Sequence, residues 1–152
     1  MRWTPYVTVA AIIQRDDKFL LVKENINNQI VYNQPAGHWE DNETLSEAVI
    51  REVMEETAWQ FKIEFITGIY QWKHPSLNKT FLRFTFAGTV GNFQPQRKLD
   101  KEIIETVWLN LEEIKKLGPQ LRSPQVILCI EDYLAGKQFS PDLLSVVMNN
   151  CN

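Results

Sequence analysis

Short apolar runs alternate with polar turn sequences along the first part of the chain. Residues 6–13 and 18–24 are rich in β-branched and apolar residues and flank the turn Arg15-Asp16-Asp17, so they predict a β-hairpin. The same pattern predicts further strands at residues 30–32, 62–69, 81–90 and 106–109. The polar stretches between them predict loops at residues 25–29, 33–37 and 92–101.

Helical signals separate and follow these strands. Thr44-Leu45-Ser46-Glu47 is a capping box with Thr44 as N-cap, and it predicts a helix from Leu45 to Thr57. A short helix is predicted at residues 111–117, before Gly118-Pro119, and a longer one at residues 124–135. A length of 152 residues predicts a single domain. We place it at residues 1–140, followed by a partly ordered C-terminal tail at residues 141–152.

One face of the helix predicted at residues 45–57 changes from apolar to acidic along its length. Its second half carries Glu52, Glu55 and Glu56 within roughly 100° of one another. Like charges three or four residues apart cost about 0.2–0.5 kcal/mol each, and the helix dipole disfavours anions near a C-terminus. A divalent cation would turn this repulsion into coordination, so the acidic face predicts a metal site. Arg51 can reach Glu47 and Glu55 and is predicted to hold the acidic residues in order.

Composition and charge restrict the class of protein. The apolar fraction of 44% and the charged fraction of 23% are typical of a soluble globular protein. A net charge of −3 without a basic run argues against nucleic-acid binding. No apolar stretch is long enough to span a membrane, and the N-terminus lacks a signal-peptide pattern. The cysteines at 129 and 151 are predicted to be unpaired, which favours the reducing cytoplasm, with a disulfide between them as the less favoured alternative.

The three glutamates end a spaced pattern that starts at Gly37. Five residues separate Gly37 from Glu43, and seven more lead to the run Arg51-Glu52-Val53-Met54-Glu55-Glu56. This pattern resembles the Nudix box, the signature of the Nudix hydrolases. One position departs from it, because Ala58 stands where the family has a glycine that ends the helix, often at positive φ. Alanine in that conformation would cost about 1 kcal/mol.

The resemblance extends over residues 5–140. The stretches NQPAGH at 33–38, FLRF at 81–84 and LRSP at 121–124 are similar to stretches of the NudJ-type phosphatases, a bacterial Nudix subgroup. The resemblance implies an α/β fold, the Nudix α/β/α sandwich with a mixed central β-sheet. It also implies attack of water on a phosphate ester or anhydride with Mg²⁺ as cofactor, for which Mn²⁺ could substitute. The implied substrates are nucleoside di- and triphosphates and the pyrophosphates of thiamin and its hydroxymethylpyrimidine precursor, with release of inorganic phosphate.

The chemistry of Mg²⁺ supports the same site. Mg²⁺ prefers hard oxygen ligands and is shared between carboxylates and substrate phosphates. Glu52, Glu55 and Glu56 are therefore the predicted catalytic residues and metal ligands, and the resemblance adds the carbonyl oxygen of Gly37. Glu43 is predicted to orient the loop of the box. Arg51, counted with the catalytic residues, is predicted to hold a glutamate in place.

Many Nudix enzymes add a carboxylate from a loop outside the box. Glu102 is the candidate here, as metal ligand or general base, with Asp100 and Glu105 behind it. A solvated loop acid is an equally favoured alternative for Glu102.

Several side chains are candidates for contact with the substrate. Arg83 lies in a predicted strand among aromatic residues, where a buried arginine needs either a phosphate or a structural salt bridge. Arg122 is expected to face phosphate or to cap a helix, and Gln34 to hydrogen-bond substrate or backbone. Aromatic candidates for stacking on a flat ring, each with core packing as the alternative, are Phe81, Trp39, Trp72 and Tyr32.

These observations predict a Mg²⁺-dependent phosphohydrolase that acts on a small phosphorylated molecule, as a monomer or a homodimer. One alternative is a pyrophosphohydrolase that cleaves X–P–P–Y substrates such as ADP-ribose or dinucleoside polyphosphates. A second alternative is a catalytically inactive Nudix domain that binds a ligand or a partner. A 5′-RNA pyrophosphohydrolase is disfavoured because no basic face is evident.

Overall fold

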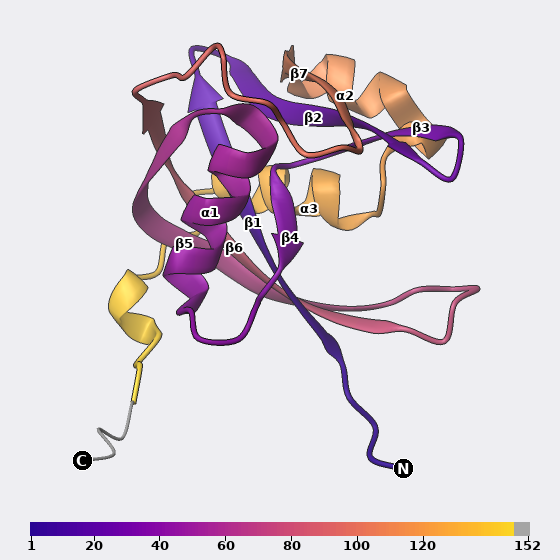
Figure 1. Ribbon diagram of the computed structural model, residues 1–152, viewed down its shortest axis with the longest axis vertical. Helices are drawn as coiled ribbons and strands as arrows, with labels where there is room; N and C mark the ends of the chain where they lie inside the picture. The colour runs from indigo at the N-terminus through magenta and orange to yellow at the C-terminus, as the bar shows by residue number, and fades with distance from the viewer. Residues whose placement is uncertain (148–152) are drawn as a thin grey trace.

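The structure is a computed structural model, and it describes residues 1–147 of the chain. The strands are β1 (Tyr6–Arg15), β2 (Lys18–Ile26), β3 (Gln29–Asn33), β4 (Ala36–His38), β5 (Gln60–Lys73), β6 (Thr80–Gly91) and β7 (Ile103–Asn110). The helices are α1 (Leu45–Thr57), α2 (Leu111–Leu117) and α3 (Gln125–Leu134), with 3₁₀ turns η1 (Gly118–Gln120) and η2 (Pro141–Leu143). Figure 1 shows their arrangement.

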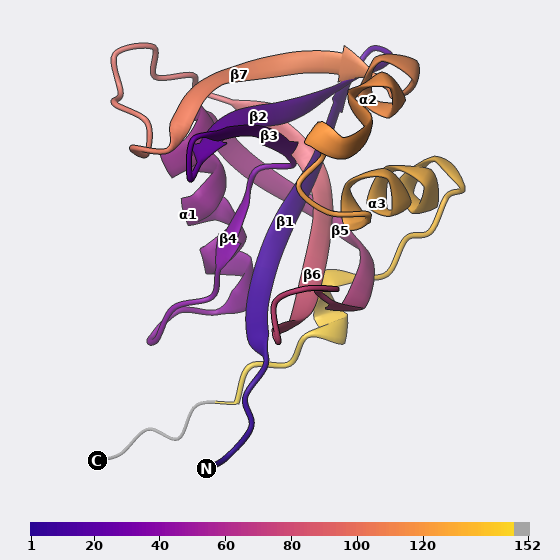
Figure 2. The same cartoon turned by 90° about the vertical axis from the view of Figure 1, so that its right-hand side faces the viewer.

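The strands form one mixed sheet in the order β3-β2-β1-β6-β5, in which β4 also pairs with β1 and β7 with β2. β1 and β6 are parallel, and the other paired strands are antiparallel. The predicted hairpin of β1 and β2 exists, but the two strands pair only beside the turn, at Gln14 with Phe19 and at Arg15 with Lys18. Beyond that point β1 runs between β4 and β6 while β2 runs between β3 and β7, so the sheet divides into two parts (Figure 2).

Helices cover both faces of the sheet and make the predicted α/β/α sandwich. β1 and β6 lie between α1 and α3 (Figure 2). Val9, Ala11 and Ile13 of β1 pack in the core cluster that contains α1 residues, whereas Ile12 packs in the cluster that contains α2 and α3 residues. Because both faces of β1 are buried, its sequence is apolar throughout the middle of the strand rather than alternating.

Two loops predicted from polar sequence are partly strand. Residues 25–29 contain the end of β2 and the start of β3, joined by Asn27 and Asn28, which have φ of 51° and 65°. Asparagine tolerates positive φ, so two polar residues suffice for a tight hairpin turn. Residues 33–37 lead into β4, where Gly37 pairs with Val9 of β1. The prediction of a loop was therefore wrong at Asn33, which ends β3, and at Ala36 and Gly37. Pairing with a buried strand overrides the low strand propensity of alanine and glycine there.

Part of the predicted tail contacts the domain. The backbone groups of Phe139 and Ile66 exchange hydrogen bonds of 2.8 and 2.9 Å, and Leu144, beyond η2, packs against the core cluster of the α1 face. The division of the chain at residue 140 stays a prediction. Cys129 is buried and free, while Cys151 lies outside the described residues. Among the helices of residues 1–147, none has the length and apolar character needed to cross a membrane.

Candidate active site

The limits of α1 are those that the sequence predicts. Thr44 Oγ1 accepts the N–H of Glu47 at 3.0 Å, and Glu47 Oε1 accepts the N–H of Thr44 at 3.0 Å, so the capping box is complete. The helix ends at Ala58, whose φ of 62° lies in the left-handed region. Alanine therefore keeps the positive φ that the family's glycine often has at this position. α1 has no basic residue in its last turn, so no cation there offsets the negative end of the helix dipole.

The acidic face of α1 points into the molecule. Glu52 and Glu56 are only 7% and 8% exposed, and Glu55 is half-buried. Burial raises the pKa of Glu52 to about 7, against the lowering effect of the hydrogen bond from Arg51. Burial also raises the pKa of Glu56 well above its ordinary value, although the N–H of Ala36 donates to Glu56 Oε1 at 2.8 Å. A cation bound beside carboxylates that are buried in this way would stabilise their ionised form.

Arg51 ties the box loop to the glutamates. Its Nε and Nη2 donate to the two carboxylate oxygens of Glu43 at 2.9 and 2.8 Å, and Nη1 donates to Glu52 at 2.8 Å and to Glu55 at 3.1 Å. The hydrogen bonds from Arg51 lower the pKa of Glu43. The predicted contact with Glu55 is confirmed. The predicted contact with Glu47 is wrong, because the Glu47 carboxylate is used in the capping box.

The site has the donors that a divalent cation requires. Glu52, Glu55 and Asp100 each offer a carboxylate oxygen within 4.8 Å of the others. The N–H of Asp100 donates to the carbonyl oxygen of Glu55 at 3.0 Å, which holds the loop before β7 against α1. Gly37 lies against the same carboxylates, because a Cβ built on Gly37 would stand 2.1 Å from Cδ of Glu52. Oxygen donors of this number and charge fit Mg²⁺ or Mn²⁺.

Asp100, rather than Glu102, is the loop acid that the structure brings to this group. Glu102 is exposed, its carbonyl oxygen accepts the N–H of Asn25 at 2.9 Å, and its negative charge raises the pKa of Glu24. The sequence made Asp100 a less favoured candidate than Glu102. Only the path of the loop in the structure shows which of the two carboxylates lies beside Glu52 and Glu55. A catalytic role for Glu102 stays a prediction.

Glu24 is a buried acid that sequence reasoning missed. Its side chain lies inside the molecule and forms an ion pair with Arg122, and its negative charge contributes to the raised pKa of Glu56. Arg122 does not cap α3, whose N-cap is Pro124 without a side-chain hydrogen bond. The available signal was a glutamate two residues after the apolar run of β2, but nothing local in the sequence connects it with residue 122.

Arg83 and Gln34 lie in the interior, at 3% and 1% exposure. Arg83 Nη2 donates to Gln34 Oε1 at 2.7 Å, and Gln34 Nε2 donates to the carbonyl oxygen of Val126 at 2.8 Å. Within residues 1–147, no acidic side chain forms a salt bridge with Arg83, so the salt-bridge alternative is excluded there. Burial lowers the pKa of Arg83. The predicted contacts of both side chains with substrate stay predictions.

The aromatic candidates occupy two places. The ring of Phe81 lies 5.7 Å from that of Trp72, in a stacked arrangement, and 5.5 Å from that of Tyr6. Trp39 lies in the box loop, where its Nε1 donates to the carbonyl oxygen of Glu43 at 2.7 Å. Trp72 also lines a pocket of about 350 Å³, whose lining residues are Trp72, His74, Pro75, Gly118, Leu121, Arg122, Ser123 and Pro124. Arg122 therefore lines this pocket and forms an ion pair with Glu24, whose negative charge also raises the pKa of Glu56 in α1.

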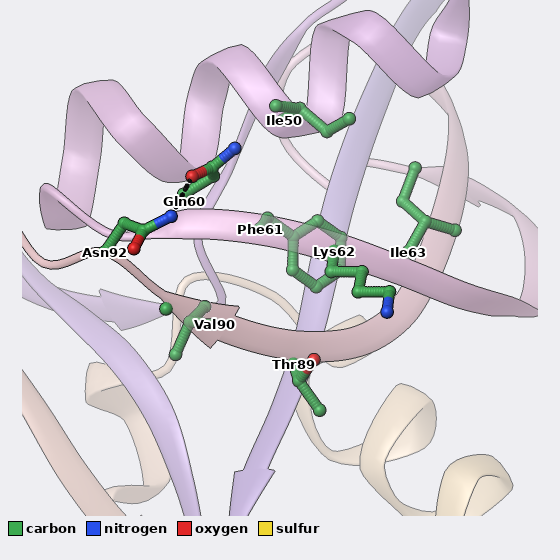
Figure 3. A pocket seen from close by; sticks show the side chains of 9 residues that line it. Ile50, Gln60, Phe61, Lys62, Ile63, Thr89, Val90 and Asn92 are labelled. Carbon is green, nitrogen blue, oxygen red and sulfur yellow. Dashed lines mark hydrogen bonds between the residues drawn. The ribbon is translucent and has the colours of Figure 1, made fainter.

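A larger hollow of about 480 Å³ lies away from these groups. Its lining residues come from the outer side of α1 and the adjoining ends of β5 and β6, and Gln60 and Asn92 form a hydrogen bond across its rim (Figure 3). It is lined by Ile50, Gln60, Phe61, Lys62, Ile63, Thr89, Val90, Gly91 and Asn92, without a carboxylate or an aromatic stack. The candidate site is therefore the acidic face of α1 with its flanking loops, not this hollow.

Comparison with known proteins agrees with this geometry. The NUDIX domain model matches residues 4–127. The "Phosphatase NudJ" of Shigella boydii is 40% identical over 141 residues, which cover 92% of this chain and 90% of that protein. A NUDIX hydrolase from Nitrosomonas europaea has a TM-score of 0.93 and 48% identity, and the match covers 95% of this chain and 98% of that one. An ADP-ribose pyrophosphatase from Streptococcus suis matches with a TM-score of 0.66 over 90% of this chain and 98% of that one, but at 22% identity it shows the fold alone. The chain therefore belongs to the Nudix hydrolases, a family of enzymes that act on phosphoanhydrides.

Proposed function

We propose that this Nudix hydrolase is a Mg²⁺-dependent phosphatase that releases inorganic phosphate from nucleoside di- and triphosphates. We extend the proposal to thiamin pyrophosphate and hydroxymethylpyrimidine pyrophosphate. The observation that carries it is the convergence of three carboxylates, the buried Glu52, the half-buried Glu55 and the exposed Asp100, with Gly37 against Glu52. The similarity to a phosphatase named NudJ, which covers nine-tenths of both chains, supports this choice within the family.

In this proposal Glu52, Glu55 and Glu56 hold Mg²⁺, with the carbonyl oxygen of Gly37 as a further ligand. When bound, Mg²⁺ supplies charge neutralisation for the phosphates and a lowered pKa for the attacking water. Arg51 holds Glu52 and Glu55 in place through the hydrogen bonds of 2.8 and 3.1 Å. Glu102 is the proposed general base or additional ligand.

Asp100 is a second loop acid for the same role as Glu102. Its carboxylate oxygen lies within 4.8 Å of ligand atoms of Glu52 and Glu55, which supports a ligand role more directly than the position of Glu102 does. A general base must reach the attacking water by one hydrogen bond, or through one further water. The two acids lie two residues apart in one loop, so substituting each in turn separates their contributions.

The rest of the substrate is proposed to extend from the acidic face toward the pocket beside Trp72. Arg122 lines that pocket and pairs with the buried Glu24, so its guanidinium can meet a phosphate between the ring and the metal. Phe81 and Trp72 present stacked rings for a flat heterocycle. Arg83 and Gln34 are kept as predicted phosphate or ring contacts, and Trp39 as a predicted stacking residue.

The test is a phosphate-release screen of the purified protein. Nucleoside di- and triphosphates, thiamin pyrophosphate and hydroxymethylpyrimidine pyrophosphate are each assayed with Mg²⁺, with Mn²⁺ and with EDTA. We expect metal-dependent release by the wild type and at least about tenfold less by Glu56→Gln, because the loss of a group that only orients a ligand already costs about 10–100-fold. Equal rates for mutant and wild type would remove the proposed metal site from the reaction.

Product analysis separates the alternatives. Free phosphate from a diphosphate supports the proposal, whereas two nucleotide-like fragments from ADP-ribose or a dinucleoside polyphosphate support the X–P–P–Y pyrophosphohydrolase. No metal-dependent product from any of these compounds would favour the inactive ligand-binding domain. A cytoplasmic location, the absence of a nucleic-acid or membrane partner, and a monomeric or homodimeric state stay predictions.

A further inference from the structure

We infer that Arg83 is a positioning residue for the carboxylate of Glu56, acting through Gln34 and the segment of residues 33–37. The inference rests on the proposed role of Glu56 as a metal ligand. It assigns Arg83 a task other than contact with the substrate.

Arg83 is a buried cation without a counter-ion. It lies in β6 and forms no salt bridge to an acid in the part of the chain that the structure describes, and its Nε has no hydrogen-bond partner there. A buried charge without a partner is costly, and well-packed apolar residues often replace buried ions without loss of stability. Core stability alone therefore does not account for an arginine at this position.

The hydrogen bonds of Arg83 end on one short segment. Its Nη2 donates to Gln34 Oε1 at 2.7 Å and lies 3.4 Å from Asn33 Oδ1. Gln34 is also held at its other end, because Nε2 donates to the carbonyl oxygen of Val126 in α3. The Gln34 side-chain amide thus links β6 to α3 and is held through both its oxygen and its nitrogen.

The residues after Gln34 contact the metal-binding carboxylates directly. The carbonyl oxygen of Pro35 accepts the N–H of Ala11 in β1 at 2.9 Å. The N–H of Ala36 donates to Glu56 Oε1 at 2.8 Å, and Gly37 lies against the carboxylate of Glu52. A displacement of Gln34 is therefore transmitted to the donor that holds Glu56.

The shape of the side chain matters to this role. The planar guanidinium places one nitrogen near both side-chain oxygens of consecutive residues, Asn33 and Gln34, from the neighbouring part of the sheet. A lysine ammonium keeps the charge but not this rigid fork, so Arg83→Lys is expected to reproduce only part of the effect. Removal of a group that orients a metal ligand by hydrogen bonding typically lowers metal affinity or activity by about 10–100-fold.

The experiment measures Mn²⁺ binding by calorimetry and by electron paramagnetic resonance, beside steady-state kinetics, for Arg83→Met, Arg83→Lys and the control Arg2→Met at an exposed arginine. For Arg83→Met we expect Mn²⁺ affinity to fall by about tenfold and kcat by about tenfold or more, with KM changed less than about twofold. Arg83→Lys is expected to lie between Arg83→Met and the wild type, and Arg2→Met to match the wild type. A rise in KM with unchanged Mn²⁺ affinity would overturn the inference and support a substrate contact instead.

Two further measurements keep the inference open to refutation. Gln34→Leu breaks the link in its middle, so it must show the same loss of Mn²⁺ affinity, and wild-type affinity in this variant contradicts the inference even if Arg83→Met fails to fold. The double variant Arg83→Met with Glu56→Gln must bind Mn²⁺ no more weakly than Glu56→Gln alone, and additive losses would show that Arg83 acts elsewhere. A wild type that binds Mn²⁺ but releases no phosphate would reject the proposed function while leaving these binding tests valid.

Discussion

Glu52→Gln is expected to make the metal-free protein more stable at neutral and alkaline pH while removing its activity. Burial holds the pKa of Glu52 at about 7, against an ordinary value of 4.5. A difference of this size corresponds to about 3 kcal/mol of unfavourable free energy for the ionised carboxylate in the folded state. Because the folded-state pKa is raised, the stability associated with this group is fully present below pH 4.5 and is lost as the pH rises through about 7.

Glutamine has nearly the same shape and keeps an oxygen to accept the hydrogen bond of 2.8 Å from Arg51, but it does not ionise. The variant therefore does not undergo the decrease in the free energy of unfolding that the wild type undergoes between pH 4.5 and about 7. In EDTA, the two proteins should have equal free energies of unfolding at pH 4.5, and the variant should be more stable at pH 8 by up to about 3 kcal/mol. Mg²⁺ reverses the order by stabilising only the wild type, by about 4.1 kcal/mol at a thousandfold excess over its Kd.

The assay is urea unfolding followed by tryptophan fluorescence at pH 4.5, 6 and 8, in EDTA and in Mg²⁺, with Glu131→Gln as the control at an exposed glutamate of α3. The control should follow the wild type at every pH. The reasoning is refuted if metal-free Glu52→Gln is less stable than the wild type at pH 8, because the carboxylate would then be stabilising without a metal. A pH-independent difference between the two proteins would also refute it.

Four further predictions concern other positions in and around the site. Gly37→Ala places a Cβ 2.1 Å from Cδ of Glu52, so we expect at least about a tenfold loss of Mn²⁺ affinity, measured by calorimetry. Ala58→Gly relieves about 1 kcal/mol of strain at φ 62° but removes a methyl group that is 3% exposed and worth about 0.8 kcal/mol, so urea unfolding should show a change within about 0.5 kcal/mol. Glu102→Gln should lower turnover more than about tenfold, as removal of a general base does. Asp100→Asn should mainly weaken Mn²⁺ binding, measured by calorimetry. If Glu102→Gln instead lost Mn²⁺ affinity and Asp100→Asn lost turnover, Asp100 would be the general base and Glu102 the metal ligand.

Predictions from the sequence were accurate where the interactions join residues close in the chain, and they failed where the interactions join distant residues. The limits of α1 were predictable because a capping box acts over three residues and the helix period acts over four. β4 was not predictable, because Ala36 and Gly37 become strand only by pairing with β1, more than 20 residues earlier in the chain. Glu24 was missed for the same reason, since its partner Arg122 lies 98 residues away.

The sequence by itself determined the chemistry of this protein, and the tertiary structure decided how it is arranged. The pattern from Gly37 to Glu56 spans one short strand, one loop and one helix that are consecutive in the chain, so its spacing was enough to identify the family and to single out the carboxylates. Burial of Glu52 and Glu56 and the approach of Asp100 arise only when α1, β4 and the loop before β7 pack together. Exposure, pKa and counter-charge depend on what surrounds a side chain in space, and those surroundings come from residues distant in sequence. Arg83 shows this most clearly, because only the structure reveals that the cation forms no salt bridge within residues 1–147 and donates a hydrogen bond to Gln34.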